Sequence, residues 1–439
     1  MLNRWLFTQI DNSALVVFRI IFGLLLALQA FSDVALGWVR RSLIAPQETF
    51  NFIGFEFLQP LPGDGMIYYY LIMGLFGLLV MVGYKYRFSI IAFTIMWSGV
   101  YLMQKTSYNN HYYLLMLLGI IMTFLPANRY ASIDAWKNPK LRAISMPRWV
   151  WLVIVLQLWI VYTYASVAKL YLGWFDGSFF NILLRSKQHY WMVGEFLQEK
   201  WVHTTMAWFG FLFDLTTIPL FLNRKTRIPA FIAAIFFHLF NSFIFHIGIF
   251  PYLSLAFALF FFSSEKINKN ILRGKKKFYT GNEIKVPAYR NLIVVVLGIW
   301  FILQIGLPLR HWFFKDDVLW TEEGHRLSWR MMLRAKSGRS TFKVVERGTR
   351  DTIIVQKTDY LTPKQNRAIN SKPDLIWQFA QRLKREYAKK GKDVQVFADA
   401  RVSVNGQGYH PFTDPKVDLA NEPWYHFKHN DWILPSQFE

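Results

Sequence analysis

One lysine stands at the outer end of a long apolar segment with no acidic residue nearby. Lys169 follows the apolar run that begins near Trp149, and no aspartate or glutamate occurs from Thr163 to Phe175. A helical lysine finds partners three or four residues away, and those positions hold no carboxylate. An ammonium kept from water and from a partner tends to lose its proton, which makes a neutral amine base. The alternative is a lysine that ends a membrane helix and extends to the interface.

Amide and imidazole side chains interrupt two other apolar stretches. Asn109, Asn110 and His111 lie in a short connection, while His238 and Asn241 are three apart and share one helix face. Asn-Asn is also ordinary turn chemistry, and a lone histidine in an apolar helix is usually a hydrogen-bonded core residue. Their clustering toward the side of Lys169 favours a lined cavity. No His-Glu-x-x-His or comparable zinc spacing occurs, so we predict no metal site.

The elements that position these residues are membrane helices. The 439-residue chain is 53% hydrophobic and 18% aromatic, with a mean hydropathy of +0.20, and several runs approach the roughly 20 residues that cross a bilayer. We predict a membrane α-helical bundle of about eight or nine transmembrane helices with a small α+β extracytoplasmic C-terminal domain. Nine spans are expected near residues 14–31, 66–84, 88–103, 112–126, 149–168, 204–222, 228–247, 249–263 and 290–309. The short pair around Gly248 leaves a single re-entrant unit open.

Basic residues mark the cytoplasmic side. The net charge is +22, and with a cytoplasmic N-terminus the inner connections carry the basic runs at 85–87, 129–148, 224–227 and 266–277. This is the positive-inside bias, which fits orientation in a membrane better than nucleic-acid binding. We therefore predict a multi-pass integral membrane protein that contacts membrane lipid and no nucleic acid. The C-terminal part and the end of the span that carries Lys169 then face outward.

Composition changes sharply after the last span, which predicts two domains. We expect residues 1–309 to form a transmembrane helical domain, which is the catalytic domain if Lys169 is a base, and residues 310–439 to form an α+β domain with strands near 341–345, 351–356 and 393–405 and a helix at 373–390. The chain has no cysteine, so the outer domain depends on packing rather than disulfides. Arg19, inside the first span, is expected to pair with Asp214 in the sixth, because a charge in a span usually faces a partner.

Long ordered motifs connect the chain to a known family. It resembles the vitamin K-dependent gamma-glutamyl carboxylases, within the wider HTTM membrane family that bacteria share. The motifs that carry the resemblance are Tyr101–Leu114, Phe124–Asp134, Ile160–Leu170, Phe237–Phe250, Ser328–Met332, Val402–Asn405 and Asp414–Asp418. They occur in the same order over nearly the whole chain, which makes them far more specific than one short pattern.

The resemblance implies an enzyme of the carbon–carbon lyase class. In the family's reaction, a neutral lysine amine deprotonates vitamin K hydroquinone (reduced menaquinone or phylloquinone), which then reacts with O2 and is converted to the epoxide. The base formed on the way removes a γ proton from a glutamate side chain of a peptide or protein, and the carbanion takes up CO2. Lys169 matches the family's catalytic lysine, and Asn110 and His111 match its outer loop near the reacting centre. A bacterial inner membrane is the implied location.

Further site residues follow from the same comparison and from residue type. A flat quinone needs a dry aromatic cavity, for which we predict the set His238, Asn241, Tyr162, Trp174 and Phe245. The predicted set for the glutamyl substrate is Trp329, Arg334 and Lys336. An arginine fork suits a carboxylate, although a solvated basic face is the alternative for the two cations.

The chain departs from animal members at several positions. Ala168 replaces the first lysine of a pair, Arg330 replaces an aspartate, and Arg334 and Lys336 stand where those enzymes have His and Arg. Hydroquinone chemistry is therefore better supported than peptide carboxylation. Two other functions stay open: a quinone epoxidase-like enzyme that does not carboxylate, and a non-enzymatic membrane scaffold or sensor of the same fold.

Overall fold

Long apolar helices make up the larger part of the molecule. The computed structural model describes residues 2–278 and 283–437. Within those residues, seven helices are long and apolar enough to cross a membrane and two apolar helices are shorter. The seven are α2 (Ser13–Ala35), α3 (Gly65–Val82), α4 (Tyr86–Met103), α7 (Arg148–Val167), α10 (Lys200–Leu222), α11 (Arg227–Phe245) and α14 (Arg290–Leu309). The two shorter helices are α5 (Asn110–Phe124) and α12 (Phe250–Phe257). Each coincides with one predicted span, which confirms the helical bundle.

The stretch around Gly248 divides into one long helix and one short helix. Helix α11 ends at Phe245, and the left-handed backbone of the next residue, His246 (φ 51°), interrupts the apolar run before α12 begins. Helix α12 has eight residues and continues into the short 3-10 helix η5 (Ala258–Phe260). At about 1.5 Å per residue, α12 rises only about 12 Å, well short of a bilayer core of roughly 30 Å.

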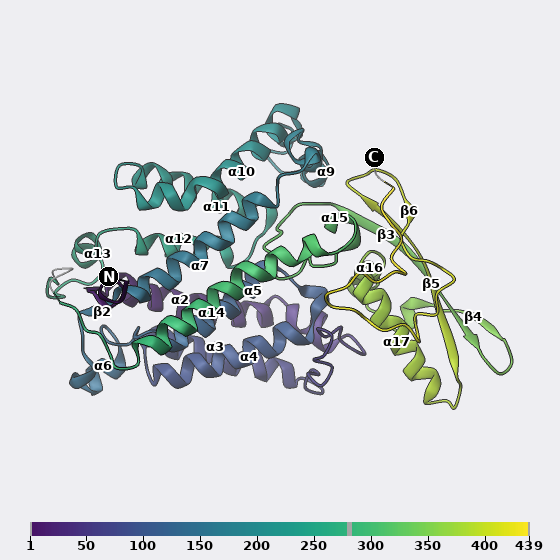
Figure 1. Cartoon of the computed structure of the whole chain (residues 1–439), viewed down its shortest axis with the longest axis horizontal. Helices are drawn as coiled ribbons and strands as arrows, with labels where there is room; N and C mark the ends of the chain where they lie inside the picture. Colours follow the sequence, from purple (N-terminus) through teal and green to yellow (C-terminus); the bar gives the residue numbers. More distant parts are fainter. Residues whose placement is uncertain (1, 279–282, 438–439) are drawn as a thin grey trace.

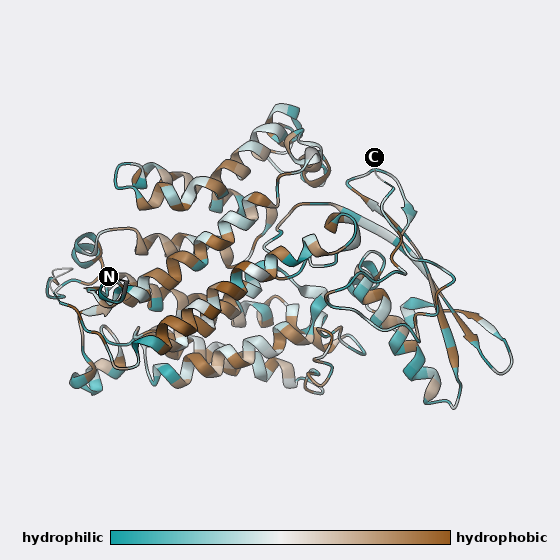
Figure 2. Cartoon of the chain, viewed as in Figure 1, coloured by the Kyte–Doolittle hydropathy of each residue, from teal (hydrophilic) through white to brown (hydrophobic). Residues whose placement is uncertain are grey.

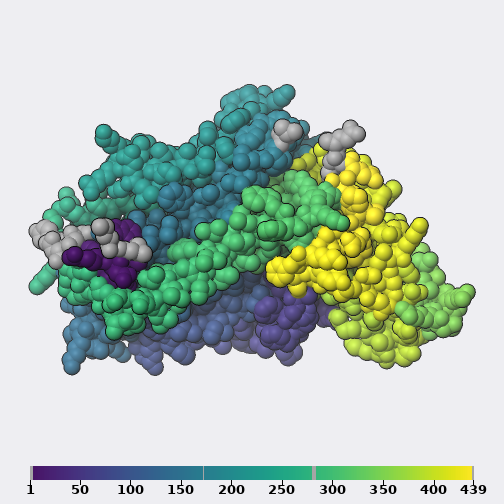
Figure 3. All heavy atoms as spheres, viewed as in Figure 1, coloured from purple at the N-terminus to yellow at the C-terminus, as the bar shows by residue number. Residues whose placement is uncertain are grey.

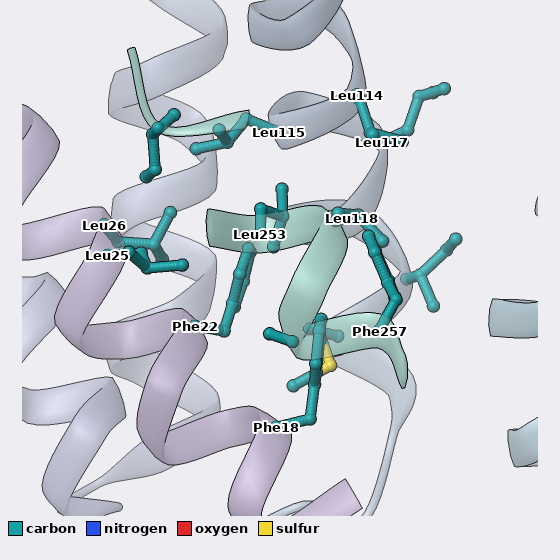
Figure 4. Packing of buried hydrophobic residues seen from close by; sticks show 14 of the residues in the cluster. Phe18, Phe22, Leu25, Leu26, Leu114, Leu115, Leu117, Leu118, Leu253 and Phe257 are labelled. Carbon is teal, nitrogen blue, oxygen red and sulfur yellow. The ribbon is translucent and has the colours of Figure 1, made fainter. Parts of the chain in front are cut away.

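The centre of the bundle is packed by aliphatic and phenyl side chains. Figure 4 shows Phe18 and Phe22 of α2 meeting leucines of α5 and Leu253 and Phe257 of α12. The rings of Phe18 and Phe257 stack with centroids 5.0 Å apart. These elements are far apart in the sequence, so the contacts fix α12 against the first helix of the bundle.

Two glycines let α2 and α3 approach at backbone distance. A Cβ at Gly23 would lie 2.3 Å from the backbone nitrogen of Met81, and one at Gly77 would lie 2.7 Å from that of Ala27. Small residues serve this purpose in membrane helix pairs, where close packing replaces the hydrophobic effect as the main attraction.

The N-terminal segment and two basic connections meet at one end of the bundle. Strand β1 (Gln9–Asp11) pairs with β2 (Ser145–Pro147), and Lys275 lies 2.7 Å from Asp11. Helices α1 (Leu2–Phe7), α6 (Ile133–Lys137) and α13 (Ser264–Asn270) cover the same end (Figure 1). The Arg19 guanidinium donates to the Ala131 carbonyl at 2.6 Å, and Asp214 pairs elsewhere, so the predicted Arg19–Asp214 pair is wrong.

The C-terminal domain lies at the opposite end of the bundle (Figure 1). Its four-stranded antiparallel sheet has the order β4-β3-β5-β6. The strands are β3 (Lys336–Glu346), β4 (Thr352–Ile354), β5 (Val394–Val404) and β6 (His410–Pro411). Helix α17 (Pro373–Ala388) covers one face, with Phe379 edge-on to Phe342 at 4.8 Å. The predicted strands and helix of this region are confirmed, and Figure 2 shows their more hydrophilic colouring beside the brown bundle.

Hydrogen bonds and a buried ion pair attach this domain to the bundle. Gln365 of α16 (Pro363–Ile369) donates to the Glu48 carbonyl at 2.7 Å. Asp374, at the start of α17, lies 2.6 Å from Lys105 in the connection between α4 and α5, and Arg326 holds the same carboxylate. In the space-filling view the C-terminal residues pack directly against the end of the bundle (Figure 3).

Candidate active site

An apolar chamber lies where α7, α10, α11 and α12 converge. Its volume is about 380 Å³, which falls within the usual range of small-molecule sites. The short helices α8 (Leu172–Phe175), α9 (Ser178–Arg185) and η4 (Phe196–Gln198) contribute to its wall. Seven predicted site residues line it: His111, Tyr162, Lys169, Trp174, His238, Asn241 and Phe245. The fold therefore brings together residues that are up to 134 positions apart (His111 to Phe245).

Lys169 is buried and directed into the protein. The residue is 6% exposed, and its Nζ turns back along α7 to donate to the Ala165 carbonyl at 2.9 Å. The ammonium also lies 5.4 Å from the centre of the Trp174 ring. The interpretation of Lys169 as a side chain that extends to the membrane interface is therefore wrong.

Asp214 is the partner that the sequence did not assign to Lys169. Its carboxylate, carried by α10, forms an ion pair and a hydrogen bond with the Lys169 Nζ. Both side chains line the chamber and are buried. The expectation of an unpaired lysine is wrong, because local spacing excluded only neighbours on α7 and said nothing about a facing helix. The signal for Asp214 was its position as the lone carboxylate within an apolar span.

Two histidines, His111 and His238, lie against Phe250 in another part of the chamber wall. The Tyr162 hydroxyl and His238 Nε2 lie 3.0 Å apart, and the rings of His111 and Phe250 stack with centroids 4.1 Å apart. The His238 ring meets Phe250 edge-on at 5.9 Å. Phe250 thus joins the two imidazoles, which come from α5 and α11, on one side of the cavity. Phe250 ends the Phe237–Phe250 motif but was not in the predicted cofactor set.

The other cofactor residues have structural contacts that fix their orientation. The Trp174 indole donates to the Ala207 carbonyl at 2.9 Å and stacks on Phe179 at 5.5 Å. The Asn241 side-chain amide nitrogen donates to the Phe237 carbonyl one turn earlier, at 2.8 Å. This bond does not use the Asn241 amide oxygen. These contacts hold an aromatic and an amide side chain in place at the chamber wall.

Asn110 and Trp329 lie outside the chamber and support its wall. The Asn110 amide accepts from the Tyr108 hydroxyl at 2.8 Å and donates to the Arg330 carbonyl at 3.1 Å. Trp329 is buried against Tyr113, with ring centroids 4.9 Å apart. The next two residues, Met331 and Met332, enter the chamber lining. Asn110 and Trp329 therefore position the segment that brings these methionines to the chamber.

Arg334 and Lys336 surround an internal carboxylate, Glu322. The Arg334 Nε lies 3.0 Å from Glu322 Oε1, and the Lys336 Nζ lies 3.6 Å from the same oxygen. Burial alone raises the pKa of Glu322, but the charges of Arg334 and Lys336 outweigh it and hold that pKa well below its ordinary value. Burial lowers the pKa of Lys336 to about 7. A solvated basic face is excluded for these residues, and Glu322 was not singled out from the sequence.

Comparison with known protein families agrees with this architecture. Residues 7–265 match the HTTM domain, and residues 289–439 match the vitamin K-dependent gamma-carboxylase lumenal domain. No solved structure matches the chain. The helical bundle with the chamber falls in the first match and the sheet domain in the second, which makes the C-terminal domain lumenal or extracytoplasmic. The chain belongs to the HTTM membrane family and, through its matching lumenal domain, is a vitamin K-dependent gamma-carboxylase-type membrane protein.

Proposed function

We propose that the protein is a vitamin K hydroquinone-dependent gamma-glutamyl carboxylase, which couples hydroquinone epoxidation by O2 to carboxylation of glutamate side chains with CO2. One observation carries the proposal: the buried Lys169–Asp214 pair lines an apolar, aromatic chamber. Two charges in such a place are costly to maintain, and packing gives no reason for them. Membrane-buried ionisable residues of this kind commonly serve proton transfer.

Lys169 acts as the base. Asp214 is a positioning residue that orients the lysine and accepts the proton of its ammonium group. In apolar surroundings, transfer of the ammonium proton to the Asp214 carboxylate removes both charges and leaves a neutral amine. The Ala165 carbonyl and Asp214 hold Nζ in one direction, so the amine is oriented before a ligand arrives. The amine then takes a hydroxyl proton from a ring placed in the chamber.

The chamber fits a flat apolar hydroquinone. When bound, that cofactor reacts with O2 and supplies the strong base that removes the γ proton of the acceptor glutamate. Phe250 and Trp174 offer ring faces, while His111, Tyr162, His238 and Asn241 offer hydrogen bonds to ring oxygens. Trp201 and Phe236 line the chamber and are 59% and 64% exposed. The chamber wall on the α10–α11 side therefore faces lipid, where a long-tailed quinone is dissolved.

The decisive assay separates the two reactions. Purified protein receives reduced vitamin K, a glutamyl peptide and labelled bicarbonate, and epoxide and fixed carbon are measured separately. Both products are expected in coupled amounts. Epoxide alone would establish the epoxidase-like alternative, and neither product, with the protein folded, would support the scaffold or sensor.

Arg334 gives a test of acceptor recognition. We propose that Trp329, Arg334 and Lys336 serve the glutamyl substrate, for whose carboxylate Arg334 would have to exchange its contact with Glu322. Arg334→Ala should raise the KM for the glutamyl peptide while hydroquinone epoxidation persists. Arg334→Lys, which keeps the charge beside Glu322 but lacks the planar fork, is the matched control for a purely structural role. Equal loss of both activities in Arg334→Ala would contradict recognition.

The membrane orientation is also a prediction. We propose a bacterial inner membrane protein with a cytoplasmic N-terminus, a catalytic domain of residues 1–309 and an outer domain of residues 310–439, on the strength of the basic connections. The chain has no cysteine, so single-cysteine variants report cleanly. A cysteine replacing exposed Ser337 should react with an impermeant maleimide from outside, and one replacing exposed Lys276 should react only from the cytoplasm. The reverse pattern would overturn the orientation.

A further inference from the structure

A second cavity, of about 470 Å³, lies behind the wall of the chamber. The two spaces share the turn after α7 and the segment 328–332. Lys169 and Met331 line the chamber, whereas Tyr171 and Arg330, on the same two segments, line the second cavity. We call the second cavity the outer pocket. Its polar lining has no part in the proposed reaction.

Arg330 is the unusual residue of the outer pocket. Its side chain is nine-tenths buried, and its Nε is buried without a hydrogen-bond partner in the described residues. Its Nη1 lies 3.4 Å from His311 Nε2, and no described carboxylate forms an ion pair with it. His311 Nδ1 lies 2.7 Å from the Pro308 carbonyl, which requires a proton on Nδ1 and leaves Nε2 as an acceptor. His311 therefore orients the guanidinium without neutralising it.

Other buried cations near Arg330 each have a carboxylate partner. Arg326 and Lys105 share Asp374, and Arg334 and Lys336 share Glu322. Burial lowers the pKa of Arg330 to about 10, and the opposing charge of Asp317, which is exposed, does not offset that effect. A buried charge is expensive unless an anion compensates it. The missing compensation points to an anion that enters the outer pocket from outside the chain.

The position of the outer pocket identifies the source of that anion. It lies at the outer ends of α7 and α14, beside the 3-10 helix η6 (Arg310–Phe313). Trp312 and Leu170 line it and are 64% and 59% exposed, while α14 is largely uncovered by the rest of the protein. Exposed tryptophan at the end of a lipid-facing helix marks the headgroup level of a bilayer. The anion available at that depth is the phosphate of an outer-leaflet lipid.

An exposed carboxylate in the lining of the outer pocket narrows the lipid class. Asp317 is exposed and lines the outer pocket, with one carboxylate oxygen accepting from the Leu319 backbone N–H at 2.8 Å. A carboxylate near the rim repels a purely anionic headgroup and attracts an ammonium. We propose that the outer pocket binds the headgroup of an amine-bearing phospholipid, with its phosphate on Arg330 and its ammonium toward Asp317. The acyl chains then extend along α14.

The test measures lipid binding by the full chain, delipidated in detergent. Dioleoyl phosphatidylethanolamine or phosphatidylglycerol is added, and bound lipid is counted by native mass spectrometry. Wild type should retain phosphatidylethanolamine, and Arg330→Met should bind it at least about tenfold more weakly, as expected for loss of a hydrogen bond to a charged group. Lys315→Met, which removes an exposed cation near the same rim, should bind like wild type. Asp317→Asn keeps the cap of α15 (Val318–Thr321) and should reduce the preference for phosphatidylethanolamine over phosphatidylglycerol.

Folding is checked separately. Arg330→Met removes an unpaired buried charge, so without lipid it should melt no lower than wild type. Phosphatidylethanolamine should raise the melting temperature of wild type and not that of the variant. Equal lipid binding by wild type and Arg330→Met would overturn the proposal. Displacement of the lipid by equimolar inorganic phosphate or glycerophosphoethanolamine would assign the site to a soluble phosphate, and displacement by a glutamyl peptide would assign it to the acceptor.

Discussion

Lys169→Ala is expected to lower epoxide formation at neutral pH by about 10²–10⁴-fold, the range that a positioned general base contributes. The reason is geometric, because Lys169 presents an amine inside the chamber, held by the Ala165 carbonyl and Asp214. Higher pH ionises the hydroquinone without help and should recover part of the rate. Small added amines should do the same by occupying the space that the side chain leaves. Lys169→Arg should fail as a substitute, since a guanidinium stays protonated.

Asp214 supplies the control for this experiment. Lys169→Ala leaves the Asp214 carboxylate buried without its cation, so some loss of stability is expected even if Lys169 has no chemical role. The double variant Lys169→Ala/Asp214→Asn removes both charges and should fold at least as well as Lys169→Ala while remaining inactive. Near-normal epoxidation by folded Lys169→Ala at neutral pH would refute the base assignment.

Asp374→Asn is expected to loosen the C-terminal domain from the bundle, at a cost of about 3–5 kcal/mol, the usual effect of breaking a buried charge pair. Asp374 is the shared carboxylate of Lys105 and Arg326, and its substitution leaves two buried cations uncompensated. Asp393→Asn is the matched control, because that carboxylate is exposed and its pair with Arg347 is long, at 3.5 Å. The control should cost no more than about 1 kcal/mol. Melting temperature and protease sensitivity of the domain report the difference.

The stability lost in Asp374→Asn should depend on pH in one direction. Burial alone raises the pKa of Asp374, but Arg326 and Lys105 outweigh it and hold that pKa well below its ordinary value. Such a group stabilises the fold above its unfolded pKa of about 3.9 and loses that contribution as the pH falls toward the folded pKa. The stability gap between wild type and Asp374→Asn should therefore narrow below about pH 4. A gap that stays constant to lower pH would show that the carboxylate charge is not what holds the domain.

The HTTM and lumenal-domain matches cover the bundle and the sheet domain, and together they make vitamin K-dependent carboxylation the activity to test first. The chamber adds a particular lysine, its carboxylate partner and a wall with exposed aromatic residues on α10 and α11.

The sequence by itself determined the apolar helices, the sheet domain and seven of the residues that line the chamber. Apolar transfer free energy adds along a segment, so a run such as Arg290–Leu309 is recognisable whatever packs against it. The strands of the outer domain follow from local alternation, as in the burial pattern of β5. His111, Lys169 and His238 were identifiable because polar groups in apolar runs are exceptional.

Only the tertiary structure decided which charges meet. Lys169 and Asp214 are 45 residues apart, and their pairing depends on how α7 and α10 pack and on the Lys169 side chain turning back toward Ala165. The same holds for Glu322 between Arg334 and Lys336, and for Arg330, with which no carboxylate of the described residues forms an ion pair. Pairing of buried charges is set by helix register, tilt and loop conformation across the whole bundle. Sequence spacing constrains only neighbours within one helix, which is why the Arg19–Asp214 prediction was wrong.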